Sequence, residues 1–167
     1  MREGIIRKVI ASTDAGEIAD IYRWYVENST ATFEVQPLSE SQMRKRIEEI
    51  ASRYPCFVWE EEGRILGYCY AHRWKNYAAY DITLETTIYL ASGITGQGIG
   101  RELMRTLIDE CRERGVGSLI ACITAENEGS CRFHESLGFG QVSDFRKVGM
   151  KFGRLLDVRD YQLILLS

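Results

Sequence analysis

The glycine-rich stretch over residues 93–101 constrains this chain more than any other segment, with glycine at positions 93, 96, 98 and 100. The β-branched run over residues 86–90 precedes it and predicts a strand, and apolar residues at positions 99, 103, 107, 108 and 111 predict a helix after it. Glycines let a backbone approach a ligand without Cβ clashes. The first N–H groups of a helix lie unpaired at the positive end of its dipole. The segment therefore predicts a binding site for phosphate oxygens.

Two familiar phosphate loops do not fit this stretch. A P-loop ends in Gly-Lys-Ser/Thr, whereas this loop ends in Gly98-Ile99-Gly100-Arg101. A dinucleotide loop would need its third glycine where Arg101 stands. Taken alone, the stretch is also compatible with a flexible turn before a surface helix.

Length and composition predict one soluble domain over residues 1–167. Apolar residues make up 45% and charged residues 27%, and a net charge of −3 provides no basic footprint for nucleic acid. No apolar run is long enough for a membrane span, and no signal peptide follows Met1, so we expect a cytoplasmic protein without membrane partners. The five cysteines lack paired spacing and predict buried free thiols rather than disulfides or a metal site; no metal is expected.

The order of predicted elements is βααβββαβαββ, which indicates an α/β fold with a mixed, mostly antiparallel sheet of about seven strands and about four helices. The predicted helices begin near Ser12 and at Ser39, Gly98 and Glu128, with helix-start chemistry in Ser12, Thr13 and Asp14 and a cap at Ser39. The predicted strands cover residues 4–10, 56–60, 65–72, 86–90 with the residues before them, 119–124, 139–150 and 155–166.

Glu85 lies in the strand that leads into the glycine loop. If that strand is regular, one face carries Asp81, Thr83, Glu85, Thr87 and Tyr89, and the other carries Ile82, Leu84, Ile88 and Leu90. A partly buried carboxylate with a raised pKa can accept a proton from an ammonium group. A solvated glutamate on an exposed sheet face explains the spacing equally well.

Asn127, Ser130 or Cys131, and His134 are spaced to share one face of the short helix. An amide and an imidazole there could bind a ligand and transfer a proton. Asn127 could instead be a helix cap, and His134 a packing residue. The basic and aromatic segment over residues 72–80 could line a pocket for an anionic group, or form an ordinary surface loop.

Several segments together resemble the phosphinothricin and methionine sulfone/sulfoximine acetyltransferase branch of the GNAT superfamily. The glycine loop fits the GNAT pattern Gln/Arg-x-x-Gly-x-Gly/Ala at Gly98 and Gly100, with Thr95 at the first position. More specific to this branch are Thr30-Ala31-Thr32-Phe33-Glu34 and Lys151-Phe152-Gly153-Arg154. The resemblance extends through Ile21-Tyr22, Tyr80-Asp81, Glu85, Ile88-Tyr89, Asn127-Glu128, Ser130, His134-Glu135 and Leu137-Gly138-Phe139.

This resemblance implies an acyltransferase (EC 2.3.1) that moves an acetyl group from acetyl-CoA to the amine of a small amino-acid-like substrate. Glu85 would be the base, and His134 would return a proton to coenzyme A. The implied acetyl-CoA contacts are Ile88, Tyr89, Leu90, Gly96, Gln97, Gly98, Ile99, Gly100, Arg101, Asn127 and Ser136. The amide near Leu90 would polarise the thioester carbonyl. Phe33, Arg73, Ala78, Ala79 and Tyr80, with Glu85, would line the substrate pocket, and the protein would be a homodimer.

Two positions depart from the better-known relatives and leave the substrate open. Asp81 stands where several of them carry arginine, and Leu155 stands where tryptophan is usual. Two alternatives therefore accompany the prediction. One is an acetyltransferase for another amine, such as a protein N-terminus or a polyamine. The other is a non-catalytic acetyl-CoA sensor.

Overall fold

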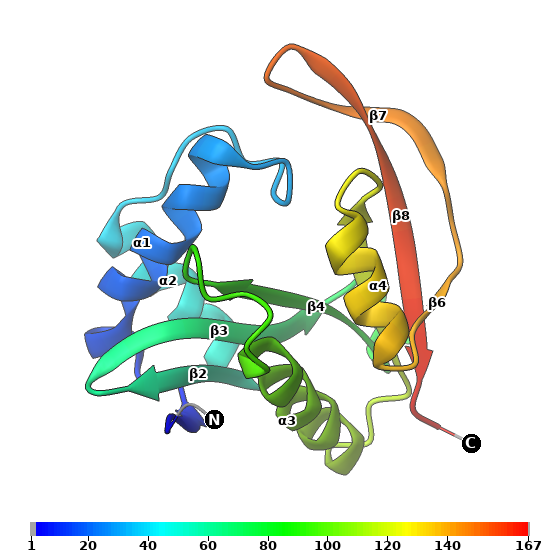
Figure 1. Ribbon diagram of the computed structural model, residues 1–167. Helices are drawn as coiled ribbons and strands as arrows, with labels where there is room; N and C mark the ends of the chain where they lie inside the picture. The colour runs from blue at the N-terminus through cyan, green and yellow to red at the C-terminus, as the bar shows by residue number, and fades with distance from the viewer. Residues whose placement is uncertain (1–2, 167) are drawn as a thin grey trace.

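The computed structural model describes residues 3–166 (Figure 1). Over these residues the chain forms eight strands, four α-helices and one 3-10 helix. The helices are α1 (Ala11–Asn28), α2 (Glu40–Ala51), α3 (Ile99–Glu113) and α4 (Glu128–Ser136), and the 3-10 helix is η1 (Ala78–Tyr80). The strands are β1 (Ile5–Lys8), β2 (Cys56–Glu61), β3 (Arg64–Arg73), β4 (Thr83–Leu90), β5 (Ser118–Thr124), β6 (Gly140–Gln141), β7 (Phe145–Lys151) and β8 (Arg154–Ile164).

All eight strands belong to one sheet with the order β1-β2-β3-β4-β5-β8-β6, and β7 pairs with β8 beside this path. Every described pairing is antiparallel except the one between β4 and β5, which is parallel. A parallel pair needs a crossover, and α3 supplies it between β4 and β5. The mixed α/β architecture predicted from the sequence is confirmed.

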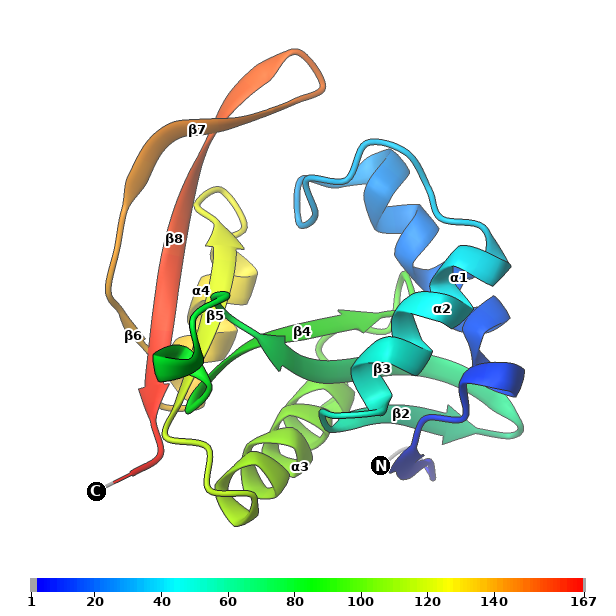
Figure 2. The same cartoon turned by 180° about the vertical axis from the view of Figure 1, so that it is seen from behind.

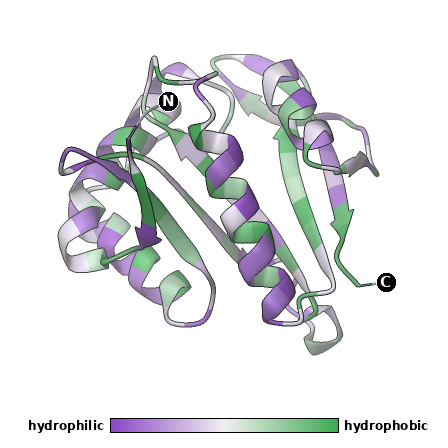
Figure 3. Ribbon diagram, turned by 60° about the horizontal axis from the view of Figure 1, so that its bottom comes forward, coloured by the Kyte–Doolittle hydropathy of each residue, from purple (hydrophilic) through white to green (hydrophobic). Residues whose placement is uncertain are grey.

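Two hydrophobic clusters cover the two faces of the sheet. Helices α1 and α2 pack on one face with Val58, Tyr68 and Tyr70. Helix α3 packs on the other face, and α4 contributes Cys131 to the same cluster. The stripe predicted for α3 is buried: Ile99, Leu103, Leu107, Ile108 and Cys111 are at most 7% exposed. Figure 3 shows this helix with apolar and polar residues on opposite sides, as expected for a helix on a sheet.

The closing strands differ from the prediction. Residues 139–150 were expected to form one strand, but they form β6 and most of β7, which raises the number of strands from about seven to eight. Between β6 and β7 the chain is held to β8 by Val142 N, which donates to Asp160 O, and by Ser143 Oγ, which accepts from Asp160 N. The pairing of β7 with β8 then shifts register between Phe145 and Gly149, where Lys147 has a φ of 54°. These tertiary bonds have no local sequence signal.

The two N-terminal helices begin in different ways. Ser39 caps α2 as predicted, in a capping box with Gln42. Helix α1 begins at Ala11, one residue from the predicted start near Ser12, but Ile10 is its N-cap residue and the Ile10 side chain cannot cap. Asp14 replaces the cap by accepting from Ile10 N at 2.7 Å, and Arg7 pairs with the same carboxylate at 2.8 Å. Over residues 3–166, no helix is both long enough and apolar enough to cross a membrane.

Candidate active site

A cleft opens where β4 and β5 part. The two strands pair only from Thr83 with Ser118 to Glu85 with Ile120. Beyond these pairs they diverge, as Figure 2 shows, and a cleft of about 1000 Å³ fills the gap. Residues 85–90 of β4 and residues 121–124 of β5 line its two walls. Ala31, Thr32 and Phe33, from the loop after α1, line it as well.

The glycine-rich stretch over residues 93–101, which we call the anion loop, forms one end of this cleft. Thr95, Gly96, Gly98, Gly100 and Arg101 line it. Gly96 and Gly98 have φ values of 79° and 87°, which glycine adopts without strain, and a Cβ on either would meet nothing within 4 Å. Gly98 is the N-cap of α3, and its carbonyl accepts the first helical bond from Glu102 N. The N–H groups of residues 99–101 thus lie outside the helical ladder at the positive helix end, which suits a pyrophosphate.

The backbone of β4 presents a second row of polar groups to the gap. Ala91 N donates to Leu66 O of β3, and Gly67 is the Cα partner of Leu90. Because backbone groups alternate in direction along a strand, those of Ile88 and Leu90 point away from β3, toward the side where β5 has separated. The Leu90 carbonyl accepts from Tyr25 Oη at 2.6 Å. This strand edge can pair with an extended amide-containing ligand, which agrees with the acetyl-CoA contacts that the family resemblance implies at Ile88, Tyr89 and Leu90.

Glu85 lies at the vertex of the cleft, half-buried, where β4 and β5 last pair. Among the described residues, its carboxylate makes no hydrogen bond or ion pair. Burial raises the pKa of Glu85, His72 on β3 partly opposes this, and the negative charge of Asp160 adds to it. A half-buried carboxylate with a raised pKa at the narrow end of a cleft has the properties of a general base.

His134 lines the cleft from α4 and is only 4% exposed. Its Nδ1 lies 2.8 Å from the Ser130 carbonyl oxygen. A carbonyl only accepts, so Nδ1 carries the hydrogen of the neutral ring and Nε2 is left as an acceptor. Burial lowers the pKa of His134, and the bond to Ser130 opposes this in part. The ring is therefore neutral near pH 7, and it can supply a proton only after taking one at Nε2.

Asn127 both caps helix α4 and lines the cleft. Its Oδ1 accepts from Ser130 N, so the capping interpretation of the sequence is confirmed, and the residue also lines the cleft. Because the cap uses the amide oxygen, the amide NH₂ group remains available for a ligand carbonyl. Ser136 does not line the cleft, but its Oγ accepts from Arg101 at 2.9 Å. Ser136 thus reaches the anion loop through Arg101.

Four residues predicted to bind the substrate lie outside the lining of the cleft. Among the described residues, the lining of the cleft includes Phe33 but not Arg73, Ala78, Ala79 or Tyr80. Arg73 pairs with Asp81 at 3.0 Å and borders a shallow hollow beside the end of α2. Residues 78–80 form η1, where Lys75 lies over the rings of Trp74 and Tyr80. Their role in substrate binding stays a prediction, and the structure does not bring them to the cleft. Gln97 and Ile99 also fall outside the lining, with Ile99 buried in the core.

The cleft contains residues that the sequence analysis did not assign to the site. Tyr25, Cys122, Thr124 and Phe133 all line it. Tyr25 could be read only as an inward residue of α1, since its contact with Leu90 spans 65 positions of sequence. Cys122 is exposed, unlike the other four cysteines, which are buried as predicted. Partial burial of its thiol, with the charges of Asp160 and Glu85, raises the pKa of Cys122 to about 12. This thiol is therefore protonated at neutral pH and is a poor nucleophile.

Comparison with known proteins places these features among acetyltransferases. Residues 18–139 match the acetyltransferase (GNAT) family, and this segment contains the glycine loop, Glu85 and His134. Over 152 residues the chain is 37% identical to a phosphinothricin N-acetyltransferase of Alcaligenes faecalis, covering 90% of this chain and 77% of that protein. It is 31% identical over 152 residues to an L-methionine sulfoximine/L-methionine sulfone acetyltransferase of Pseudomonas aeruginosa, covering 90% and 88%.

A solved structure shares the whole architecture. The crystal structure of a GNAT superfamily phosphinothricin acetyltransferase from Sinorhizobium meliloti, in complex with acetyl-CoA, superposes with a TM-score of 0.93 at 35% identity. The superposition covers 98% of this chain and 89% of that chain.

Proposed function

The chain belongs to the acetyltransferase (GNAT) family, and we propose that it transfers the acetyl group of acetyl-CoA to the amine of a small amino-acid-like substrate. The observation that carries this proposal is the cleft between β4 and β5, which has an anion loop at one end and Glu85 at its vertex. The named activities of the relatives suggest methionine sulfone, methionine sulfoximine or phosphinothricin as acceptors.

The chain offers three sets of groups to acetyl-CoA. The N–H groups at the start of α3, with Arg101, would hold the pyrophosphate. The outward backbone groups of Ile88 and Leu90, with the Asn127 amide, would pair with the pantetheine arm. The outward N–H of Leu90 would donate to the thioester carbonyl, whose oxygen gains negative charge during attack. When bound, acetyl-CoA supplies the activated acetyl group.

Glu85 takes a proton from the substrate ammonium group, and the free amine then attacks the thioester carbon. The raised pKa of the Cys122 thiol makes it a poor nucleophile at neutral pH, which favours direct attack of the amine over an acetyl-cysteine intermediate.

His134 handles the second proton. Its bare Nε2 accepts that proton from the nitrogen that has attacked, and it returns the proton to the departing thiolate. A lowered pKa makes the protonated ring a ready donor. Of the three protons on the ammonium group, one stays on the amide, one ends on coenzyme A and one is released through Glu85.

We also propose that the protein is a cytoplasmic homodimer that joins through the β7–β8 hairpin. This hairpin exposes Phe145, Val148, Met150, Phe152 and Leu155, each at least 50% accessible. An apolar surface of this kind suits a subunit interface.

The dimer is tested by light scattering, which measures the molar mass in solution. The wild-type protein is expected to have twice the mass of one chain, and the Met150→Glu variant is expected to have the mass of one chain. A monomeric wild-type protein would refute the dimer.

The activity is tested by release of free thiol from acetyl-CoA in the presence of different amines. The panel contains the three proposed acceptors, free amino acids, a polyamine and a peptide with a free N-terminus. Turnover restricted to the methionine analogues or phosphinothricin supports the proposal. Turnover on the polyamine or the peptide would show that the acceptor is a different kind of amine. Acetyl-CoA binding without turnover on any amine would favour a non-catalytic sensor.

The pH dependence of this reaction is expected to show the raised pKa of Glu85. The base works as the carboxylate, so kcat/KM falls as the pH drops through the Glu85 pKa. Because that pKa is raised above 4.5, the midpoint of the acidic limb is expected above pH 4.5. Rates from pH 4.5 to 9 measure it, with thermal unfolding at each pH as the control. An acidic limb that persists in Glu85→Gln would contradict this assignment.

A further inference from the structure

Lys151, the last residue of β7, is a buried cation that lies outside the catalytic groups. It is 3% exposed, and its ammonium group donates to three backbone carbonyls. The bonds are 2.6 Å to Ser29 O, 2.8 Å to Thr32 O and 3.3 Å to Tyr25 O. An ammonium group has three hydrogens, so these bonds use all of them.

The three carbonyls belong to the end of α1 and to the loop after it. The last carbonyls of a helix lack helical partners and form the negative end of its dipole. Among the described residues, no carboxylate pairs with Lys151, so backbone dipoles and the nearby Phe152 ring balance its charge. One side chain of the C-terminal hairpin thus organises a loop that lies more than a hundred residues earlier in the chain.

We name residues 29–33 the roof loop because they span the opening between β4 and β5. On the β4 side, Tyr89 Oη donates to Ala31 O at 3.4 Å. On the β5 side, Thr124 Oγ1 donates to Thr30 O at 2.6 Å. Tyr89 lies four residues after Glu85 in β4, and because side chains alternate between the two faces of a strand, both lie on the same face. The roof loop therefore covers the face of the cleft to which the Glu85 side chain belongs.

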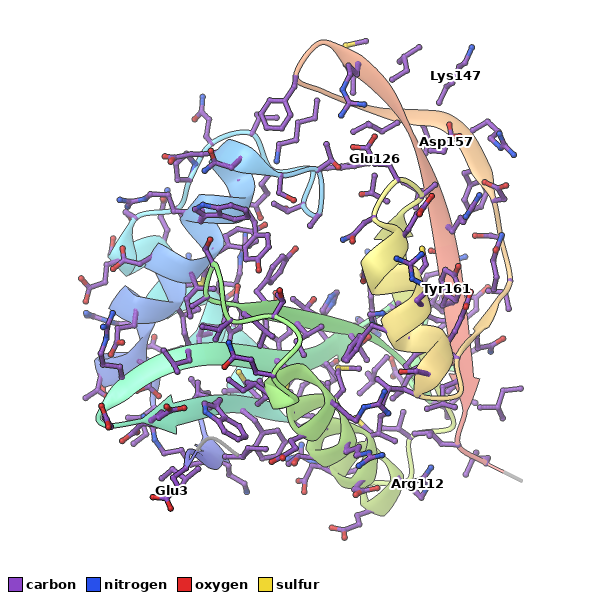
Figure 4. The ribbon with its side chains drawn as sticks, in the orientation of Figure 1. Glu3, Arg112, Glu126, Lys147, Asp157 and Tyr161 are labelled. Carbon is purple, nitrogen blue, oxygen red and sulfur yellow. The ribbon has the colours of Figure 1, made fainter. Side chains whose placement is uncertain are left out.

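A second set of polar contacts, exposed to solvent, links the roof loop to the same hairpin. Thr30 Oγ1 donates to Glu126 Oε1 at 2.6 Å, and Arg154 pairs with both oxygens of Glu126 at 2.9 and 3.0 Å. Figure 4 shows Glu126 in the space between this loop and the hairpin. The ring of Phe33 also packs on Gly149 of β7, where a Cβ would overlap the ring.

We propose that Lys151 is a positioning residue for the amine substrate, which holds the roof loop closed over the acceptor end of the cleft. This inference rests on the proposed function, because it assigns the compartment between the roof loop and Glu85 to the amine. The anion loop lies at the other end of the cleft and has no described contact with Lys151. Loss of the ammonium group should therefore affect the amine much more than acetyl-CoA.

The test compares Lys151→Met with Lys147→Met, the same change on the same strand. Lys147 is exposed, and Figure 4 shows it at the outer side of the hairpin. In Lys151→Met we expect KM for the amine to rise about tenfold, with kcat and the acetyl-CoA Kd within about threefold of wild type. Hydrogen exchange at Ala31 and Glu34, whose N–H groups donate to Ser29 Oγ and Thr32 Oγ1, should become faster. Lys147→Met should change none of these quantities.

Arg154→Met provides a second variant in case Lys151→Met does not fold. It removes only the exposed contacts of Arg154 with Glu126, and we expect a rise of about threefold in KM for the amine with faster exchange at the same two amides. Unchanged amine KM and unchanged exchange in the folded variants would overturn the proposal, even if their melting temperature falls. If the wild-type protein acetylates no amine, the proposed function fails, whereas the exchange measurement still decides whether Lys151 holds the roof loop.

Discussion

Replacement of Glu85 by glutamine is expected to lower kcat/KM for the amine by about 10²- to 10⁴-fold, which is the usual contribution of a positioned general base. The amide has nearly the same shape, so the half-buried position should stay filled and the melting temperature should stay near that of wild type. The loss has a chemical cause, since a glutamine cannot take the proton from an ammonium group.

The measurement is thiol release at several pH values, together with the acetyl-CoA Kd by calorimetry. The Kd is expected to stay within about twofold, because Glu85 lies at the vertex and the anion loop at the far end of the cleft. Glu62→Gln, which removes the same charge from the β2–β3 turn, serves as the matched control and should keep full activity. A Glu85→Gln enzyme with wild-type kcat/KM would show that this carboxylate is not the base.

Replacement of Gly98 by alanine is expected to weaken acetyl-CoA binding by about 30-fold, which corresponds to about 2 kcal/mol. The methyl group would stand in the open space where a phosphate approaches the N-terminus of α3. The left-handed φ of 87° would also become unfavourable, so the loop would move away from it. Loss of one or two bonds from backbone N–H groups to a charged oxygen accounts for this magnitude.

Gly63→Ala separates backbone strain from ligand binding. Gly63 lies in the β2–β3 turn with a φ of 76°, and a Cβ there also meets nothing within 4 Å. Both variants are expected to lose about 1 kcal/mol of unfolding free energy, because alanine disfavours a left-handed backbone. Only Gly98→Ala should raise the acetyl-CoA Kd. Equal affinities in the two variants would mean that this loop does not hold the phosphates.

Local patterns predicted the elements well. The apolar spacing of residues 99–111 marks a helix with one buried face, and all five of its predicted inward residues are buried. Ser39 and Gln42 mark the start of α2 through side chains that contact their own neighbours. The anion loop lies between its strand and its helix as predicted. Gly96 and Gly98 have positive φ values there, which glycine adopts without strain because it has no Cβ.

The prediction of a single closing strand failed because distant contacts decided the outcome. The break between β6 and β7 depends on bonds to β8. These bonds have no local pattern, since the partners are chosen by the folded sheet. The motif that contains Lys151 was visible in the sequence, but its three carbonyl partners lie 119 to 126 residues away.

The sequence by itself determined the order of the elements, the helix faces and the place of the anion loop, because these follow from residue spacing and backbone preference over a few positions. Only the tertiary structure decided that β4 and β5 part after Glu85, and this separation makes the cleft and exposes the β4 edge. It also decided that the roof loop closes over the gap between β4 and β5. These outcomes depend on pairing and burial between distant segments, where the free energy comes from contacts that no single stretch of sequence contains.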